Sequence, residues 1–203
     1  MKRDEDEKLK WKLLDTKHPV QNQWLDLREE TYQMPDGSVA GPFYTFSKKS
    51  YVVIAAMDED DRFVCVRQYR QGIGKVTVEF PAGAIETSMR HPDRETAFAA
   101  AQRELMEETG CVSEHWQFLE EIASMPSLND DYAYLYLARG CRRVGEQKLD
   151  VTEFLEYETY SMEEIRAMIM DGSFPQPVHA LAYYMAKEVL KKSGHSTEDN
   201  KGE

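Results

Sequence analysis

The chain has 203 residues, of which 41% are hydrophobic and 31% charged, which is ordinary for one globular domain with a buried core. Its formal net charge of −12 argues against a nucleic-acid or anionic-membrane surface, because either would need a basic patch. The three cysteines lack the spacing of a disulfide framework or a zinc site, and we expect free thiols in a cytoplasmic protein with neither a signal peptide nor a transmembrane segment.

The first 47 residues are predicted to form an N-terminal arm. Residues 1–12 are highly charged and are expected to be a frayed or weakly helical start. The alternating pattern within 21–32 predicts a strand, 35–37 a turn, and 43–46 the returning strand. A two-stranded hairpin is only marginally stable alone, so its apolar face needs a partner, either the sheet of the same subunit or another subunit.

Residues 48–192 are predicted to form the main domain, in which strands precede and follow one central helix. That helix, from about 94 to 109, begins after Asp93, a good N-cap residue, and ends before Gly110, a good C′ residue. The predicted strands cover residues 51–57, 62–69, 76–80, 116–124, 132–138 and 154–160.

Two closing helices are predicted, over residues 162–170 and 178–192, and the polar tail 193–203 is expected to be disordered. Strands on both sides of one central helix, followed by two more helices, indicate an α+β fold with a mixed sheet between helical layers.

The last turns of the central helix carry three carboxylates. Glu104 and Glu108 lie one above the other at helical spacing, and Glu107 lies beside them. Like charges at this spacing repel, and a bound cation would reverse that cost. Oxygen ligands suit a hard divalent ion, Mg²⁺ first and Mn²⁺ next. The alternative is a solvated acidic face on which Arg103 pairs with Glu107.

The same helix, with Glu95 ahead of its charged residues and Gly110 behind them, resembles the helix half of the Nudix hydrolase signature. The chain departs from that pattern in two places. Gly83 lies twelve residues before Glu95, which makes the loop six residues longer than in the family, and Cys111 stands where an aliphatic residue is usual. The resemblance implies an α/β/α sandwich and metal-dependent hydrolysis of a diphosphate bond.

Other segments resemble the ADP-ribose and nucleoside-diphosphate-sugar pyrophosphatase branch of that family. They are residues 66–70 followed by 79–83, Pro126, the acidic stretch 150–157, and Trp24 with the paired N-terminal strands. The branch implies hydrolysis of ADP-ribose or a related sugar nucleotide to a nucleoside monophosphate and a sugar phosphate. It also implies a homodimer that is formed through the arm.

The resemblance assigns metal-binding roles to the side chains of Glu104, Glu108 and Glu107 and to the main-chain carbonyl of Ala82. Arg103 would hold the carboxylates in position, and Glu95 is a second candidate for this role. A helix-dipole role explains Glu95 equally well.

The resemblance also assigns the general base, which must reach the attacking water, to Glu153. Its rivals are Asp130, Asp131, Asp150 and Glu156. The expected substrate-binding residues are Arg67, Arg70, Glu79 and Trp24, with Glu79 on a sugar hydroxyl and Trp24 on the base. An ion pair is the alternative for Arg70 and Glu79, and a packing role is the alternative for Trp24.

Two other functions remain open at this point. One is hydrolysis of nucleoside triphosphates or dinucleoside polyphosphates on the same helix. The other is a non-catalytic module that senses a nucleotide, which loss of the helix carboxylates would mark. All of these carboxylates are present in the chain.

Overall fold

The computed structural model describes residues 5–198, with side chains as far as residue 192. The chain divides into two compact units. The arm unit consists of residues Met1–Lys49 and Ala123–Asp131, and the core unit of Ser50–Ile122 and Tyr132–Glu203. The loop 123–131 therefore belongs to the arm unit, although both of its ends continue into strands of the core unit.

The arm unit is built on a three-stranded antiparallel sheet of β1 (Lys12–Gln21), β2 (Asp26–Gln33) and β3 (Val39–Ser47), preceded by a 3₁₀ turn at Asp6–Leu9. The prediction of a two-stranded hairpin was wrong, because β1 was missed. β1 pairs with β2 through two register shifts, so its sequence lacks the clean alternation that marks a strand.

Aromatic packing ties the three strands together. The Trp11 ring lies 5.8 Å from that of Tyr32 and 5.2 Å from that of Phe43, measured between ring centroids. These contacts bring the residue before β1 against the side chains of β2 and β3. The third strand therefore adds to the stability that two strands would lack.

The core unit contains a mixed sheet with the strand order β11-β5-β4-β10-β8. Its centre is β4 (Tyr51–Asp58), which runs parallel to β10 (Tyr132–Arg143) and antiparallel to β5 (Phe63–Arg70). The other strands are β6 (Lys75–Glu79), β7 (Ala82–Ala84), β8 (Cys111–Val112), β9 (His115–Ala123) and β11 (Leu155–Tyr160). The predicted α+β fold with a mixed sheet and an antiparallel N-terminal arm is confirmed.

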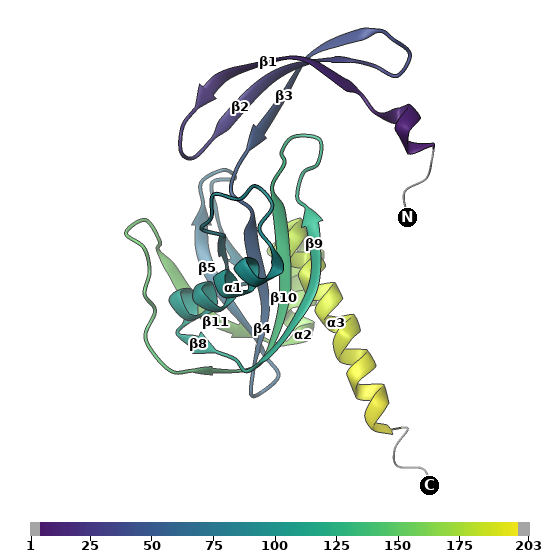
Figure 1. Cartoon of the computed structure of the whole chain (residues 1–203). Helices are drawn as coiled ribbons and strands as arrows, with labels where there is room; N and C mark the ends of the chain where they lie inside the picture. The colour runs from purple at the N-terminus through teal and green to yellow at the C-terminus, as the bar shows by residue number, and fades with distance from the viewer. Residues whose placement is uncertain (1–4, 199–203) are drawn as a thin grey trace. The chain divides into compact units, whose positions relative to one another are not determined.

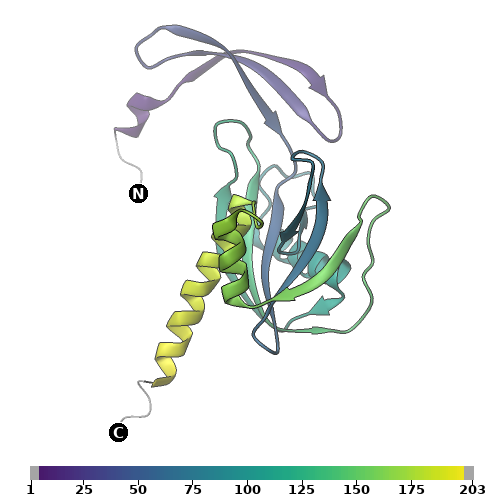
Figure 2. The same cartoon turned by 180° about the vertical axis from the view of Figure 1, so that it is seen from behind.

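Helices cover both faces of this sheet. Figures 1 and 2 show α1 (Arg94–Thr109) on one face and α2 (Met162–Asp171) with α3 (Pro177–Glu198) on the other. Val52 of β4 packs with the α1 layer, and the next residue, Val53, packs with the layer of α2 and α3. A strand that is buried on both faces needs apolar residues throughout, which is why the sequence of β4 is a continuous apolar run.

The ends of α1 follow their capping residues. The Asp93 side chain accepts a hydrogen bond from the backbone N–H of Thr96, at 2.8 Å. Gly110 adopts a left-handed φ of 70° and donates to the Met106 carbonyl. Both capping predictions are confirmed, so the sequence places the carboxylates of α1 within one helix.

Other boundaries were predicted less well. β10 continues to Arg143, into a stretch predicted as a polar loop, and the short strands β7 and β8 were not predicted. α3 continues to Glu198, beyond the predicted helix end at residue 192, and disorder of the tail stays a prediction. The rest of that tail lies outside the described residues. No helix within residues 5–198 is long and apolar enough to cross a membrane.

Candidate active site

The two expected metal-binding carboxylates of α1 are buried. Glu104 is 6% exposed and Glu108 3% exposed. Burial raises the pKa of Glu104 to about 7, and it raises the pKa of Glu108 well above its usual value. The idea of a solvated acidic face therefore fails for both residues.

Glycine at position 83 allows β7 to lie against α1. A Cβ atom at Gly83 would come within 2.0 Å of the carboxyl carbon of Glu104. Next to it, the backbone N–H of Ala82 donates to Oε2 of Glu108, at 3.0 Å. β7 pairs with β4 through Val53 and Ala82, so the longer loop that follows does not carry this segment away from the helix.

Arg103 connects the carboxylates to this segment. Its guanidinium donates to Glu104 and to Glu107, each at 2.6 Å, and to the Ala84 carbonyl, at 3.1 Å. The pairing of Arg103 with Glu107 that the sequence left open is thus present, together with a second pairing to Glu104. One cation therefore holds two carboxylates and the end of β7 in place.

The donors fit a hard divalent cation. Glu104 and Glu108 bring buried carboxylate oxygens to the place where Ala82 and Gly83 approach α1, and oxygen is the ligand atom that Mg²⁺ and Mn²⁺ prefer. Among the described residues, no three His, Cys, Asp or Glu side chains are arranged to hold a metal ion as they stand. Two of the three α1 carboxylates, Glu104 and Glu107, pair with Arg103.

Arg70 and Glu79 form an ion pair on neighbouring strands. The Glu79 carboxylate is fully buried and accepts hydrogen bonds from Arg70, Thr77 and Gln68. Burial alone would raise the pKa of Glu79, but the hydrogen bonds and the charge of Arg70 outweigh it and hold that pKa below its usual value. Glu79 therefore holds Arg70, and the structure does not present it to a sugar hydroxyl.

Arg67 points away from Arg70. Alternate residues of a strand face opposite sides of the sheet, so Arg67 and Arg70 lie on opposite faces of β5. Arg67 pairs with Glu156, and its Nε lies 3.5 Å from Glu158. The structure thus does not bring Arg67 together with the carboxylates of α1, and it engages Glu156, a rival base, in an ion pair.

Glu153 lies in the loop before β11. Its carboxylate accepts the backbone N–H of Asp150, at 3.0 Å, and its own N–H donates to the Asp150 carbonyl, at 2.9 Å. Its negative charge contributes to the raised pKa of both Glu104 and Glu108. It also borders a groove of about 770 Å³, together with Tyr69 and Phe154.

Trp24 belongs to the arm unit and is 74% exposed. It lies in the turn between β1 and β2, where Asn22 Oδ1 accepts its backbone N–H, at 2.8 Å. This large exposed aromatic side chain is free to contact a ligand or another protein surface. Asp130 and Asp131 belong to the same unit.

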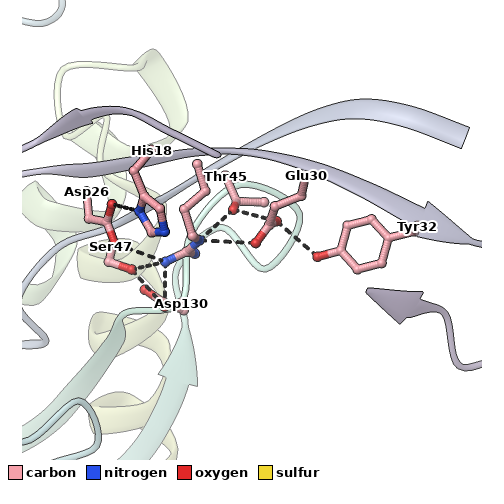
Figure 3. A network of polar contacts seen from close by, with 8 residues as sticks. His18, Asp26, Glu30, Tyr32, Thr45, Ser47 and Asp130 are labelled. Carbon is pink, nitrogen blue, oxygen red and sulfur yellow. Dashed lines mark hydrogen bonds and ion pairs between the residues drawn. The ribbon is translucent and has the colours of Figure 1, made fainter. Parts of the chain in front are cut away.

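The sequence does not predict the polar network of the arm unit (Figure 3). At its centre is Arg28, whose side chain is only 12% exposed. Its guanidinium contacts Glu30 at 3.2 Å, Thr45 at 3.1 Å and Asp130 at 3.4 Å, and Ser47 donates to Asp130 at 2.8 Å. The network ties the loop 123–131 to β2 and β3. A largely buried arginine of this kind has no sequence signal, since Arg28 lies between Leu27 and the charged Glu29 in a mostly polar strand.

Comparison with known proteins gives two family matches. Residues 47–181 match the NUDIX domain, and residues 11–46 match the nucleoside diphosphate sugar hydrolase N-terminal domain. Both matches agree with the resemblance that the motifs of α1 and of the arm suggested.

Individual relatives agree with these matches. A methanol dehydrogenase activator of Bacillus methanolicus is 28% identical over 89% of this chain and 95% of its own length. An ADP-ribose pyrophosphatase of Mycobacterium tuberculosis is 33% identical over 59% of this chain and 55% of its own. A crystal structure of an ADP compounds hydrolase has the same fold, with a TM-score of 0.78 at 19% identity over 91% of this chain and 96% of that one.

Proposed function

The chain belongs to the Nudix family, and on that premise we propose that it is a divalent-metal-dependent hydrolase of ADP-ribose or a related nucleoside diphosphate sugar. The products are a nucleoside monophosphate and a sugar phosphate. The observation that carries this proposal is the buried pair Glu104 and Glu108 beneath Ala82 and Gly83. The match of the arm to the N-terminal domain of nucleoside diphosphate sugar hydrolases and the relatives named ADP-ribose pyrophosphatase support the substrate class.

The metal-binding residues in this proposal are Glu104, Glu108 and Glu107, with the carbonyl of Ala82. Magnesium, or manganese in its place, would neutralise the diphosphate oxygens and lower the pKa of the attacking water. Arg103 keeps Glu104 and Glu107 oriented by hydrogen bonds, and it does not itself bind the metal.

Substrate binding and proton transfer fall to other residues. Arg70, which Glu79 holds in place, offers the exposed part of its guanidinium to a phosphate. Glu153 accepts the proton of the attacking water, because its carboxylate keeps free lone pairs while Oε2 accepts the Asp150 N–H. The charge of Glu153 already acts on Glu104 and Glu108, which favours it over Glu156, since Glu156 pairs with Arg67.

We also propose that residues 1–47 form a dimerising arm. β1 and the residues next to it expose large apolar side chains, among them Leu9, Trp11, Leu13 and Leu14. A second subunit would cover them, and Trp24 would contact the substrate in the neighbouring site. The three cysteines are free and buried, which fits a cytoplasmic protein.

A substrate panel tests the function. ADP-ribose, other nucleoside diphosphate sugars, nucleoside triphosphates and dinucleoside polyphosphates are incubated with the protein in Mg²⁺ or Mn²⁺, with and without EDTA, and product release is measured. We expect nucleoside diphosphate sugars to be hydrolysed fastest and EDTA to abolish the reaction. Faster hydrolysis of triphosphates would move the protein to the alternative substrate class, and binding without hydrolysis would make it a nucleotide sensor.

A further inference from the structure

His179 lies in the first turn of α3 and is only 2% exposed. Its Nδ1 is 3.2 Å from the backbone N of Phe80. A backbone N–H can only donate, so Nδ1 must carry a lone pair and the ring proton must be on Nε2. Burial lowers the pKa of His179 to about 4, so the ring is neutral at neutral pH and can accept this hydrogen bond.

Phe80 lies in a gap between two strands. β6 ends at Glu79 and β7 begins at Ala82, so the N–H of Phe80 has no partner in either sheet ladder. A buried N–H without a partner would cost about 1–3 kcal/mol. The imidazole of His179 is therefore what satisfies the backbone at this point.

Residues 80 and 81 connect Glu79, which holds the proposed phosphate-binding Arg70, to Ala82, which meets the metal-binding helix α1. Immediately before them, the Glu79 side chain holds Arg70, and immediately after them, the N–H of Ala82 donates to Glu108. The Pro81 carbonyl accepts the N–H of Ile54 on β4, at 2.9 Å. Residues 79–82 are thus fixed by four elements, β5, α1, β4 and α3, and His179 is the contribution of α3.

Aromatic packing makes the attachment of His179 rigid. The Phe80 ring lies 5.2 Å from both Phe63 and Phe174 and is stacked on His179 at 6.4 Å, measured between centroids. Phe174 also meets His179 edge-on, at 6.3 Å. The imidazole is held by ring contacts, so its Nδ1 has a fixed direction.

We propose that His179 is a positioning residue for the metal site: through Phe80 it fixes residues 79–82, so that Ala82 meets Glu108 and presents its carbonyl to the cation. This inference rests on the proposed function. His179 itself touches neither metal nor substrate, and it acts from the opposite face of the sheet to α1. Nothing in the signature of α1 points to α3.

The test compares two substitutions at His179. His179→Phe keeps a ring of similar size but removes the acceptor, whereas His179→Asn keeps an acceptor near the position of Nδ1. Mn²⁺ affinity is measured on the full-length protein by electron paramagnetic resonance, and kcat and KM are measured on the best substrate of the panel. Tyr183→Phe is the matched control, because it removes another side-chain hydrogen bond of α3, the one from the Tyr183 hydroxyl to the Met162 carbonyl.

We expect His179→Phe to bind Mn²⁺ about 10- to 100-fold more weakly and to lose kcat by a similar factor. His179→Asn should recover most of both, and Tyr183→Phe should lose thermal stability alone. If His179→Phe does not fold, His179→Leu takes its place as the variant without an acceptor.

Wild-type Mn²⁺ affinity in the folded Phe or Leu variant would overturn the inference. It would also be overturned if His179→Asn lost as much Mn²⁺ affinity and kcat as the variant without an acceptor. Failure of the proposed function is distinguishable from both outcomes. In that case the wild type hydrolyses no substrate of the panel, while the comparison of Mn²⁺ affinities still decides the role of His179.

Discussion

The carboxylate of Glu104 lies against the Cα of Gly83, so closely that a methyl group on Gly83 would come within 2.0 Å of its carboxyl carbon. Position 83 therefore requires a residue without a side chain. Because Gly83 has no Cβ, β7, which carries the Ala82 carbonyl, can lie directly on α1, which carries the carboxylates.

Gly83→Ala should disable the site. The added methyl must displace either the Glu104 carboxylate or β7, and either shift spoils the oxygen cluster, so we expect hydrolysis to fall by about 10²-fold or more. Gly72→Ala is the control, because a Cβ there would meet nothing within 4 Å. Steady-state kinetics of both variants decide, and near wild-type activity in Gly83→Ala would show that Glu104 need not keep this position.

Glu153→Gln should lower kcat and leave KM nearly unchanged, because a general base acts only as the water loses its proton. The expected loss is about 10²- to 10⁴-fold. Glu156→Gln serves as the control, since Glu156 lines the same groove as Glu153 but pairs with Arg67. An unchanged kcat in Glu153→Gln, with Asp150→Asn inactive, would move the base to Asp150.

His179 should make the folded protein less stable in mild acid. Its pKa is about 4 in the folded state against an ordinary value of 6.5, so between these values the unfolded chain binds more protons. Its contribution to the unfolding free energy is therefore complete above pH 6.5 and is lost as the pH falls towards 4, by about 3 kcal/mol in all.

Urea unfolding of the metal-free wild type and His179→Asn at pH 7 and pH 4.5 measures this contribution. The difference between the two proteins isolates His179, because Glu104, whose pKa is raised, titrates in both. We expect the stability advantage of the wild type over the variant to shrink at pH 4.5. An advantage that stays constant would mean that His179 titrates normally in the folded state.

The arm should hold two subunits together. Light scattering at micromolar concentration should give twice the chain mass of 23.5 kDa, and removal of residues 1–47 should give monomers with weaker substrate affinity. Trp24→Ala in the full-length dimer tests the aromatic contact separately, with an increase in KM expected. A 23.5 kDa wild-type species would contradict the dimer and the role of Trp24 in a neighbouring site.

The sequence predicted what rests on local rules. α1 has a capping residue at each end, and its carboxylates recur at helical spacing, so both the helix and its acidic face were predictable. β4 was predictable because a strand that is buried on both faces is apolar throughout.

The sequence predicted poorly what depends on tertiary contacts. β1 forms through pairing with register shifts, which leaves no alternation to detect. The sequence left Glu79 between a contact with substrate and an ion pair with Arg70, and the ion pair follows only from the fold, which buries Glu79. His179 depends on an unpaired N–H of a residue 99 positions away, which no local pattern encodes.

Glu108→Gln, measured for both hydrolysis and folding, tests the metal-binding role of α1 most directly. Glu108 is 3% exposed and accepts the Ala82 N–H, and an amide oxygen can accept the same hydrogen bond, so the variant should keep the melting temperature of the metal-free protein. Loss of the charge should weaken metal binding and cost roughly 10³-fold in hydrolysis of a nucleoside diphosphate sugar. A folded variant that keeps about a tenth of wild-type activity in saturating Mg²⁺, a loss of only ~1.4 kcal/mol, would contradict the assignment of α1 as the metal-binding helix.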